Sequence, residues 1–115
     1  MVRITRFYLI RKNELEVIKA DKMPIGIHVT ENTHFTNHII PYQKNDIIYL
    51  FSDGYADQFG GENGRKFMYK PFKNLLLSIH PEEMSRQMQL LEENFLAWKG
   101  NYPQVYDVLV IGIRL

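Results

Sequence analysis

The sequence contains no cysteine, no long apolar run and no run of charges of one sign. Without cysteine there is neither a disulfide framework nor a thiolate metal site, which is consistent with a reducing compartment. The N-terminus has no continuous apolar segment, so the sequence shows neither a signal peptide nor a membrane-spanning helix. We therefore expect a cytoplasmic protein that does not enter a membrane.

The charges are nearly balanced, with 14 basic and 13 acidic side chains and a formal net charge of +1. Because the two signs are interspersed, there is no electrostatic argument for binding nucleic acid or an anionic membrane. A length of 115 residues, with 45% hydrophobic and 23% charged residues, suits one core. There are no repeats, linkers or low-complexity segments, and residues 1–115 are expected to form a single domain.

The stretch Asp46–Asp57 is the feature around which the rest of the chain is organised. Ile47–Phe51 is apolar and rich in β-branched and aromatic residues, which predicts a strand buried on both faces. Asp53 and Gly54 then end the strand. A carboxylate at this position, followed by a glycine that allows a sharp turn, is suited to holding a divalent cation. Asp57 would reach the same place if the turn continues as a helix.

A simpler interpretation of Asp53-Gly54 is a hairpin turn, since Asp-Gly is a common hairpin sequence. A hairpin needs a second alternating strand directly after Gly54, and residues 60–64 instead form a glycine-rich segment. The sequence therefore favours a site at the end of the strand.

Short β-rich runs precede this stretch. Ile4–Arg11 and Leu15–Lys19 predict an antiparallel hairpin with a polar tip. Asp21–Gly26 is expected to break the pattern, because Pro24 keeps the residue before it out of the helical region. Phe35–Tyr42 predicts a further strand, which a proline near its end restricts to the edge of a sheet.

Three histidines lie in this region: His28, His34 and His38. They suggest a transition-metal site, because imidazole is the commonest ligand for such metals. No pair with ligand spacing falls on a predicted helix, so we interpret them as ordinary exposed side chains.

The apolar spacing changes to that of a helix after the glycine-rich segment. Pro71 is suited to the first turn of a helix, and His80-Pro81 ends it. The apolar residues between them recur at three- and four-residue spacing: Phe72, Leu75, Leu76 and Ile79.

A longer second helix is predicted to open at Pro81, with Glu82 and Glu83 in its first turn and Gly100 as its stop. One apolar stripe runs along it: Met84, Met88, Leu91, Phe95 and Trp98. The segment Val105–Leu115 predicts a last strand, and Val108–Ile113 is apolar enough to lie in the middle of a sheet. The predicted class is α+β, an antiparallel sheet with two consecutive helices on one face.

Three segments, Asp21–Gly26, Leu50–Gln58 and Val105–Arg114, resemble the C-terminal half of the metal-dependent protein phosphatase domain. The type is that of the sporulation stage II protein E (SpoIIE) family, a bacterial branch of the type 2C serine/threonine phosphatases. The resemblance covers nearly the whole chain. It implies half of an α-β-β-α sandwich, which in the family binds Mn²⁺ or Mg²⁺ between two sheets. A metal-bridging water there attacks the phosphorus of a phosphoprotein.

By this resemblance, Asp53 corresponds to the metal-ligand aspartate of the family's Asp-Gly-x-x-Asp motif, and Gly54 forms its turn. Asp57 matches the second aspartate, which in some members helps to hold an additional metal. The family usually has Asp-Asp before the last strand, the first being a ligand, whereas this chain has Tyr106-Asp107. A neutral phenol is a poor ligand for a hard cation, so one ligand is missing unless Asp107 replaces it.

The family's N-terminal half, with its own Asp-Gly pair at the metal centre, has no counterpart here, and Met1 falls at a strand in the middle of a full domain. We therefore expect weak Mn²⁺ or Mg²⁺ binding, on the order of millimolar, and a chain that is inactive by itself. Three hypotheses remain open, the simplest being a remnant with no separate role. The second is a portion of a bacterial signalling phosphatase, completed by a separate N-terminal half. The third is a non-catalytic interaction module, or pseudophosphatase, that has lost its ligands.

Burial makes a separate prediction about assembly. The central and closing strands are apolar on both faces, yet one pair of helices covers only one side of a sheet. Monomers rarely expose an apolar patch larger than roughly a few hundred Å². We therefore expect a homodimer in which the open face of one copy packs on that of another and rebuilds a two-sheet sandwich.

Overall fold

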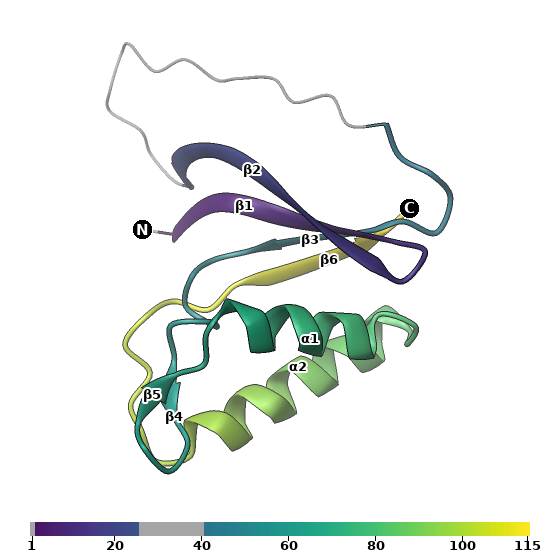
Figure 1. Ribbon diagram of the computed structural model, residues 1–115. Coiled ribbons are helices and arrows are strands. Elements are labelled where there is room, and N and C mark those ends of the chain that lie inside the picture. Colours follow the sequence, from purple (N-terminus) through teal and green to yellow (C-terminus); the bar gives the residue numbers. More distant parts are fainter. Residues whose placement is uncertain (1, 26–40) are drawn as a thin grey trace.

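The computed structural model describes residues 2–25 and 41–115, and it places the side chains of residues 6–19 and 41–115. This part of the chain forms a four-stranded sheet, a two-stranded hairpin and two helices (Figure 1). The elements in chain order are β1 (Val2–Arg11), β2 (Glu14–Ile25), β3 (Ile47–Phe51), β4 (Phe59–Gly60), β5 (Arg65–Lys66), α1 (Tyr69–Ile79), α2 (Met84–Lys99) and β6 (Val110–Arg114).

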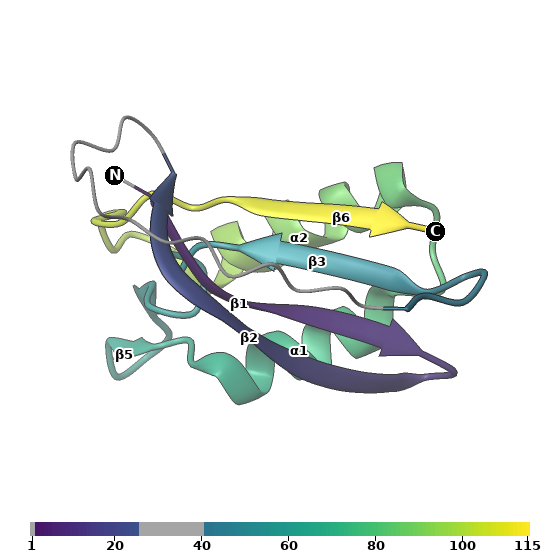
Figure 2. The same cartoon turned by 90° about the horizontal axis from the view of Figure 1, so that it is seen from above.

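The strands of the large sheet lie in the order β2-β1-β3-β6, and every neighbouring pair is antiparallel (Figure 2). Both helices lie on the same side of this sheet (Figure 1). The predicted α+β class is confirmed, as is the hairpin at the N-terminal end. Its tip is Lys12-Asn13, where both residues have positive φ (50° and 64°), as a two-residue hairpin turn requires.

The second strand is longer than predicted. The expected break at Asp21–Gly26 was wrong for residues 21–25, because β2 continues to Ile25. Pro24 pairs with Arg3 after a register shift between Ile4 and Arg6. Among the described residues β2 is an edge strand, and an edge can accommodate a proline because one side of the strand needs no hydrogen bonds.

Two expectations about buried strands were also wrong. In β3 burial alternates, with Ile47, Tyr49 and Phe51 buried and the residues between them only half-buried. β6, expected in the middle of a sheet, lies at an edge within the described residues. Its apolar composition therefore reflects a face that the helices do not cover.

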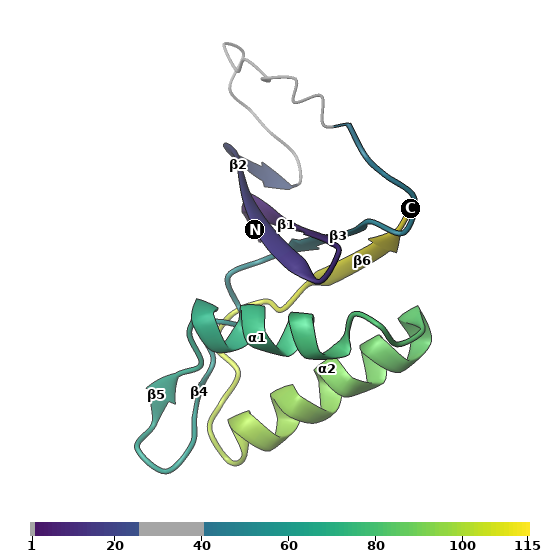
Figure 3. The ribbon, with the colours of Figure 1, turned by 45° about the vertical axis from the view of Figure 1, so that its right-hand side comes forward.

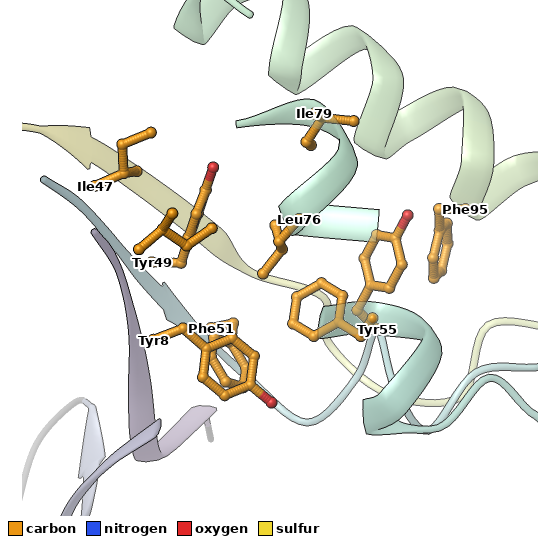
Figure 4. Close-up of a cluster of buried hydrophobic side chains, with 10 residues drawn as sticks. Tyr8, Ile47, Tyr49, Phe51, Tyr55, Leu76, Ile79 and Phe95 are labelled. Carbon is orange, nitrogen blue, oxygen red and sulfur yellow. The ribbon is translucent and has the colours of Figure 1, made fainter. Parts of the chain in front are cut away.

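The core lies between the helices and the sheet and is largely aromatic (Figure 4). Tyr8 of β1 packs on Phe51 of β3, with ring centroids 4.4 Å apart. Phe72 of α1 joins them, with its ring centroid 5.1 Å from that of Phe51, and Tyr55 stacks on Phe72 at 4.9 Å. The contact joins one turn and three elements that are distant in sequence, so it fixes the loop after β3 against α1.

The first helix matches its prediction, with Phe72, Leu76 and Ile79 buried. The second begins three residues later than expected, at Met84, so no acidic residue lies in its first turn. The carbonyls of His80 and Glu82 are instead bound by the amide of Gln87, at 3.1 and 2.9 Å. These bonds hold the preceding turn outside the helix.

The apolar stripe of α2 also differs from its prediction. Met88 is 66% exposed, whereas the polar Gln87 is buried, with only 2% of its surface exposed. Gln87 is satisfied there because it accepts a hydrogen bond of 2.5 Å from the Tyr49 hydroxyl, in addition to its bonds to the preceding turn. A buried polar side chain with all its partners is compatible with a core position.

The glycine-rich segment forms the turn of the β4–β5 hairpin, which lies at the end of the helix layer (Figure 3). Trp98 of α2 packs on it and donates from its indole N–H to the Gln58 carbonyl at 2.8 Å. A Cβ at Gly60 would approach the Trp98 carbonyl oxygen to 2.0 Å, so only glycine fits there.

No helix in residues 2–25 and 41–115 combines the length and apolar character needed to span a bilayer. The predicted strand at Phe35–Tyr42 falls outside the described residues except for Pro41 and Tyr42, which are not in a strand. His28, His34 and His38 and Gly26 lie outside the described residues as well.

Candidate functional site

The end of β3 and the segment before β6 are joined by a buried serine. The Ser52 hydroxyl donates to the Asp107 carbonyl (2.8 Å) and accepts from the Leu109 backbone N–H (2.9 Å). Gly54 lies against the same segment, because a Cβ there would come within 2.2 Å of the Asp107 carbonyl oxygen. The two motif segments found in the sequence, around Asp53 and around Asp107, therefore meet at one corner of the fold.

The Asp53 carboxylate, half-buried at this corner, accepts a hydrogen bond from the hydroxyl of Tyr69, the first residue of α1. Arg6 of β1 lies over the Tyr69 ring, with its guanidinium carbon 4.0 Å from the ring centroid. Asp53, Tyr69 and Arg6 are called the Asp53 cluster below. Burial, and then the Asp53 carboxylate, raise the pKa of Tyr69 well above its ordinary value despite the opposing Arg6 charge. The phenol is therefore a hydrogen-bond donor at neutral pH.

Tyr8 lies beside the Asp53 cluster. It is completely buried, and its hydroxyl has no hydrogen-bond partner among the described residues. Burial raises the pKa of Tyr8, Arg6 lowers it and Asp53 raises it further, so its hydroxyl lies in the field of both charges. The corner thus brings together a carboxylate, a guanidinium and two phenols, from β1, α1 and the turn after β3.

The other predicted site residues have separate surroundings. The backbone N–H of Asp57 donates to the Asp53 carbonyl (2.9 Å), which closes one helix-like turn, but the turn does not continue as a helix. The Asp57 carboxylate, however, lies 3.7 Å from the Lys66 ammonium of β5. Tyr106 and Asp107 are both exposed, and Asp107 contributes its backbone carbonyl to the corner.

A metal centre needs several carboxylate or imidazole ligands that converge on one point. In the two described stretches of the chain, no three His, Cys, Asp or Glu side chains gather in this way. Asp53 is bonded by a phenol with a guanidinium beside it, and a nearby positive charge disfavours a second cation. These residues alone do not fit a metal ion. The assignment of Asp53, Asp57 and Asp107 as metal ligands stays a prediction.

The opposite end of β3 holds an acidic residue whose role the sequence did not reveal. Asp46 is 2% exposed, and both of its carboxylate oxygens accept hydrogen bonds from Arg11 of β1. The shortest of these bonds, from Nη2 to Oδ2, is 2.7 Å long. The Gln43 backbone N–H donates to the same oxygen at 2.7 Å. These bonds lower the pKa of Asp46, Arg11 first and Gln43 second. The signal in the sequence was an aspartate directly before an apolar strand.

A cavity of about 440 Å³ opens between α2 and β6. Its lining is mostly apolar and includes Met84, Leu91 and Val110, with Glu92 as its charged member. The polar groups that reach it are already bonded, since Gln87 binds Tyr49 and the Tyr55 hydroxyl donates to the Leu91 carbonyl at 2.7 Å. Glu92 is therefore the member of the lining whose polar group is left for a ligand.

Comparisons with known proteins agree with the motifs. The family model described as "Stage II sporulation protein E (SpoIIE)" matches residues 5–115. The fold is similar to that of a solved structure, "SiaA-PP2C domain of Pseudomonas aeruginosa", with a TM-score of 0.78 and 23% sequence identity. The match covers 96% of this chain and 42% of that chain, so this chain spans less than half of the solved one. No curated protein matches the sequence. The resemblance seen in the sequence, and the partial type 2C phosphatase fold that it implied, are confirmed.

Proposed function

We propose that this chain, which belongs to the stage II sporulation protein E (SpoIIE) family, is part of a phosphatase-type domain whose catalytic centre is completed by a further polypeptide. The observation that carries the proposal is the corner where Gly54 packs on Asp107. Two of the family's motif segments meet there, yet too few ligands gather among the described residues to hold a metal. The proposed substrate is a phosphoserine or phosphothreonine protein in bacterial cytoplasmic signalling. Mn²⁺ or Mg²⁺ is the proposed cofactor of the completed centre.

The first experiment measures hydrolysis of p-nitrophenyl phosphate. With Mn²⁺, the chain should turn over the substrate no faster than Mn²⁺ alone, because two-metal chemistry needs both ions to be held. Tyr106→Asp should not restore activity, since it supplies one ligand of the several that are needed. Asp53→Asn is the matched control for contaminating phosphatase. Mn²⁺-dependent turnover by the wild-type chain that is lost in Asp53→Asn would contradict an incomplete centre.

The second experiment asks whether a complementary half-domain makes the chain active. Mixing the chain with the complementary half of a SpoIIE-type phosphatase domain should produce Mn²⁺-dependent turnover. The same mixture with Asp53→Asn should be inactive. Complexes that form but remain inactive would favour the second candidate function, a non-catalytic module.

The second candidate rests on the sheet face opposite the helices, called the outer face. Its apolar members are Phe7, Leu9, Ile48, Leu50, Ile111 and Ile113, which the strand register places on the side away from the core. The two in β6, Ile111 and Ile113, are 41% and 44% exposed. Leu9 is already buried in the single chain, at 2% exposed, whereas an interaction module that pairs the outer faces of two copies would bury Ile111 and Ile113 in an isologous dimer.

Light scattering coupled to size-exclusion chromatography tests this candidate. The wild-type chain should elute as a dimer, and Ile113→Lys should shift it to a monomer because a charge would be buried at the interface. Val17→Lys is the matched control: Val17 is 39% exposed but lies on the helix side of β2, opposite Tyr8. A folded wild-type monomer at micromolar concentration would exclude the outer-face dimer.

A further inference from the structure

We infer that the Asp53 cluster opposes cation binding: the Tyr69 hydroxyl occupies one oxygen of Asp53, Oδ1, and a divalent cation that binds this oxygen must displace the hydroxyl. This inference rests on the proposed function for one point, the identity of the competing ligand. The cluster itself is a feature of the described side chains: Tyr69 donates to the Asp53 carboxylate, and Arg6 lies over the Tyr69 ring.

The two partners are held by the same piece of backbone. The Met68 N–H donates to the Ala56 carbonyl at 2.8 Å, and the Phe67 N–H donates to the Gln58 carbonyl at 3.0 Å. The residues just before Tyr69 are therefore tied to the turn that follows Asp53. A phenol anchored in this way loses little entropy in forming its bond, so the contact is preorganised.

The backbone at Met68 shows how firmly Tyr69 is directed. Met68 precedes α1 with φ 81° and ψ 161°, a conformation that is almost confined to glycine. Its side chain is 58% exposed, so packing of that side chain does not account for the conformation. The hydrogen bonds of the Phe67 and Met68 N–H groups hold this conformation, and as a result the side chain of Tyr69, the first of the helix, lies at Asp53.

Charge adds to the block. A divalent cation at Asp53 would lie near the Arg6 guanidinium, and like charges at short range oppose one another. The phenol also gives up a charge-assisted hydrogen bond when a cation replaces it, and such bonds are stronger than neutral ones. Both effects weaken the binding of a cation to Asp53, whatever other ligands the cation has. Further carboxylates from a completing polypeptide would be needed to overcome them.

The test is Mn²⁺ affinity, measured by the electron paramagnetic resonance signal of free Mn²⁺, with no substrate present. Tyr69→Phe keeps the ring and removes the hydroxyl, and it should bind Mn²⁺ about ten-fold more tightly than the wild-type chain, the factor expected for one charge-assisted hydrogen bond. Arg6→Gln should strengthen binding as well. Tyr55→Phe is the matched control, because that buried hydroxyl donates to the Leu91 carbonyl.

The gain should disappear in the double variant Tyr69→Phe/Asp53→Asn. Equal affinity in Tyr69→Phe, Arg6→Gln and wild type would overturn the inference, provided that far-ultraviolet circular dichroism shows the fold intact in at least one of the two variants. If Asp53→Asn weakens wild-type binding in the same experiment, Asp53 remains a ligand and only the inference fails. If Asp53→Asn has no effect in either background, the proposed metal role of Asp53 fails with it.

Discussion

The two ends of β3 make an informative pair, because each carries an aspartate and each is approached by an arginine of β1. At the first end, two nitrogens of Arg11 donate hydrogen bonds to the Asp46 carboxylate, and 2% of Asp46 is exposed. At the other end, Arg6 lies over an aromatic ring and the carboxylate of Asp53 is bonded by a phenol.

The difference lies in how much bonding capacity each carboxylate has left. Asp46 accepts hydrogen bonds from Arg11 and from the Gln43 backbone, so it is committed to holding the turn before β3. Asp53 is half-buried and has one hydrogen-bond donor among the described side chains. A carboxylate with free lone pairs at a corner where two chain segments meet is able to accept another ligand. The same residue type thus has a structural role before β3 and keeps unused acceptor capacity after it.

The largest effect is expected from Gly54→Ala, which breaks the Asp53 end. The new Cβ would meet the Asp107 carbonyl carbon at 2.8 Å as well as its oxygen, and backbone cannot move aside cheaply. We expect a loss of about 3 kcal/mol or more in the free energy of unfolding, measured by urea denaturation. Gly100→Ala is the control: nothing lies within 4 Å and only its backbone conformation, φ 52° and ψ −123°, opposes the change, so a smaller cost of about 1–3 kcal/mol is expected there. Equal costs would show that the corner is not tightly packed.

Asp46→Asn should weaken the hydrogen bonds at the other end of β3 and leave Asp53 unaffected. The amide cannot accept from Arg11 and Gln43 as the carboxylate does, and the Arg11 guanidinium loses its counter-charge. The melting temperature should fall clearly, while the Mn²⁺ affinity of the chain should not change. A change in Mn²⁺ affinity would show that the two ends are coupled.

The pH dependence follows from the same contact. The pKa of Asp46 is lowered in the folded chain, so its contribution to stability is complete above the unfolded pKa of about 3.9. That contribution is lost as the pH falls through the folded pKa. Thermal unfolding should therefore show a loss of stability below about pH 4, and Asp46→Asn should reduce the size of this loss. An unchanged acid profile in the variant would contradict the assignment.

Ser52→Ala tests the Asp53 end more gently. It removes the donor to the Asp107 carbonyl and the acceptor for the Leu109 N–H, inside a residue that is 4% exposed. We expect a loss of about 1–3 kcal/mol, by urea denaturation. Ser78→Ala, whose hydroxyl donates to a carbonyl on an exposed helix surface, should cost much less. Similar costs for the two would contradict a stabilising role of the Ser52 bonds.

Asp57→Asn should have the smallest effect. Its ion pair with Lys66 is long, at 3.7 Å, and both side chains are substantially exposed. Such pairs contribute about 0–1 kcal/mol, so the free energy of unfolding should hardly change. A loss comparable to that of Ser52→Ala would show that Asp57 has a further partner at the Asp53 end.

Local patterns in the sequence were sufficient for β3, α1 and the first hairpin. In each of them apolar spacing and turn residues agree, and the bounds of β3 match residue for residue. The length of β2 was missed because an edge strand tolerates Pro24, and a sequence does not say which strand is at the edge. Gln87 was missed because its partner Tyr49 is 38 residues away.

The candidate site divides in the same way. Asp53 and Gly54 were found from an acidic turn after an apolar strand, which is a local signal. Tyr69 and Arg6 were not found, because their contacts with the corner join residues that only the tertiary fold brings together. Nothing in the sequence around Tyr69 indicates that its hydroxyl binds Asp53, 16 residues earlier. The hydrogen-bond partner of Asp53 therefore could not be predicted from the sequence.

The packing of Trp98 has an optical consequence. It is the single tryptophan of the sequence, and its indole N–H is bonded to Gln58, in the turn that leads from Asp53 into the hairpin. Its ring is also 5.5 Å from that of Phe67, centroid to centroid. The intrinsic tryptophan fluorescence of this chain therefore originates at one defined place, where α2 meets the hairpin. A change in its emission reports on that junction separately from the backbone signal of the sheet.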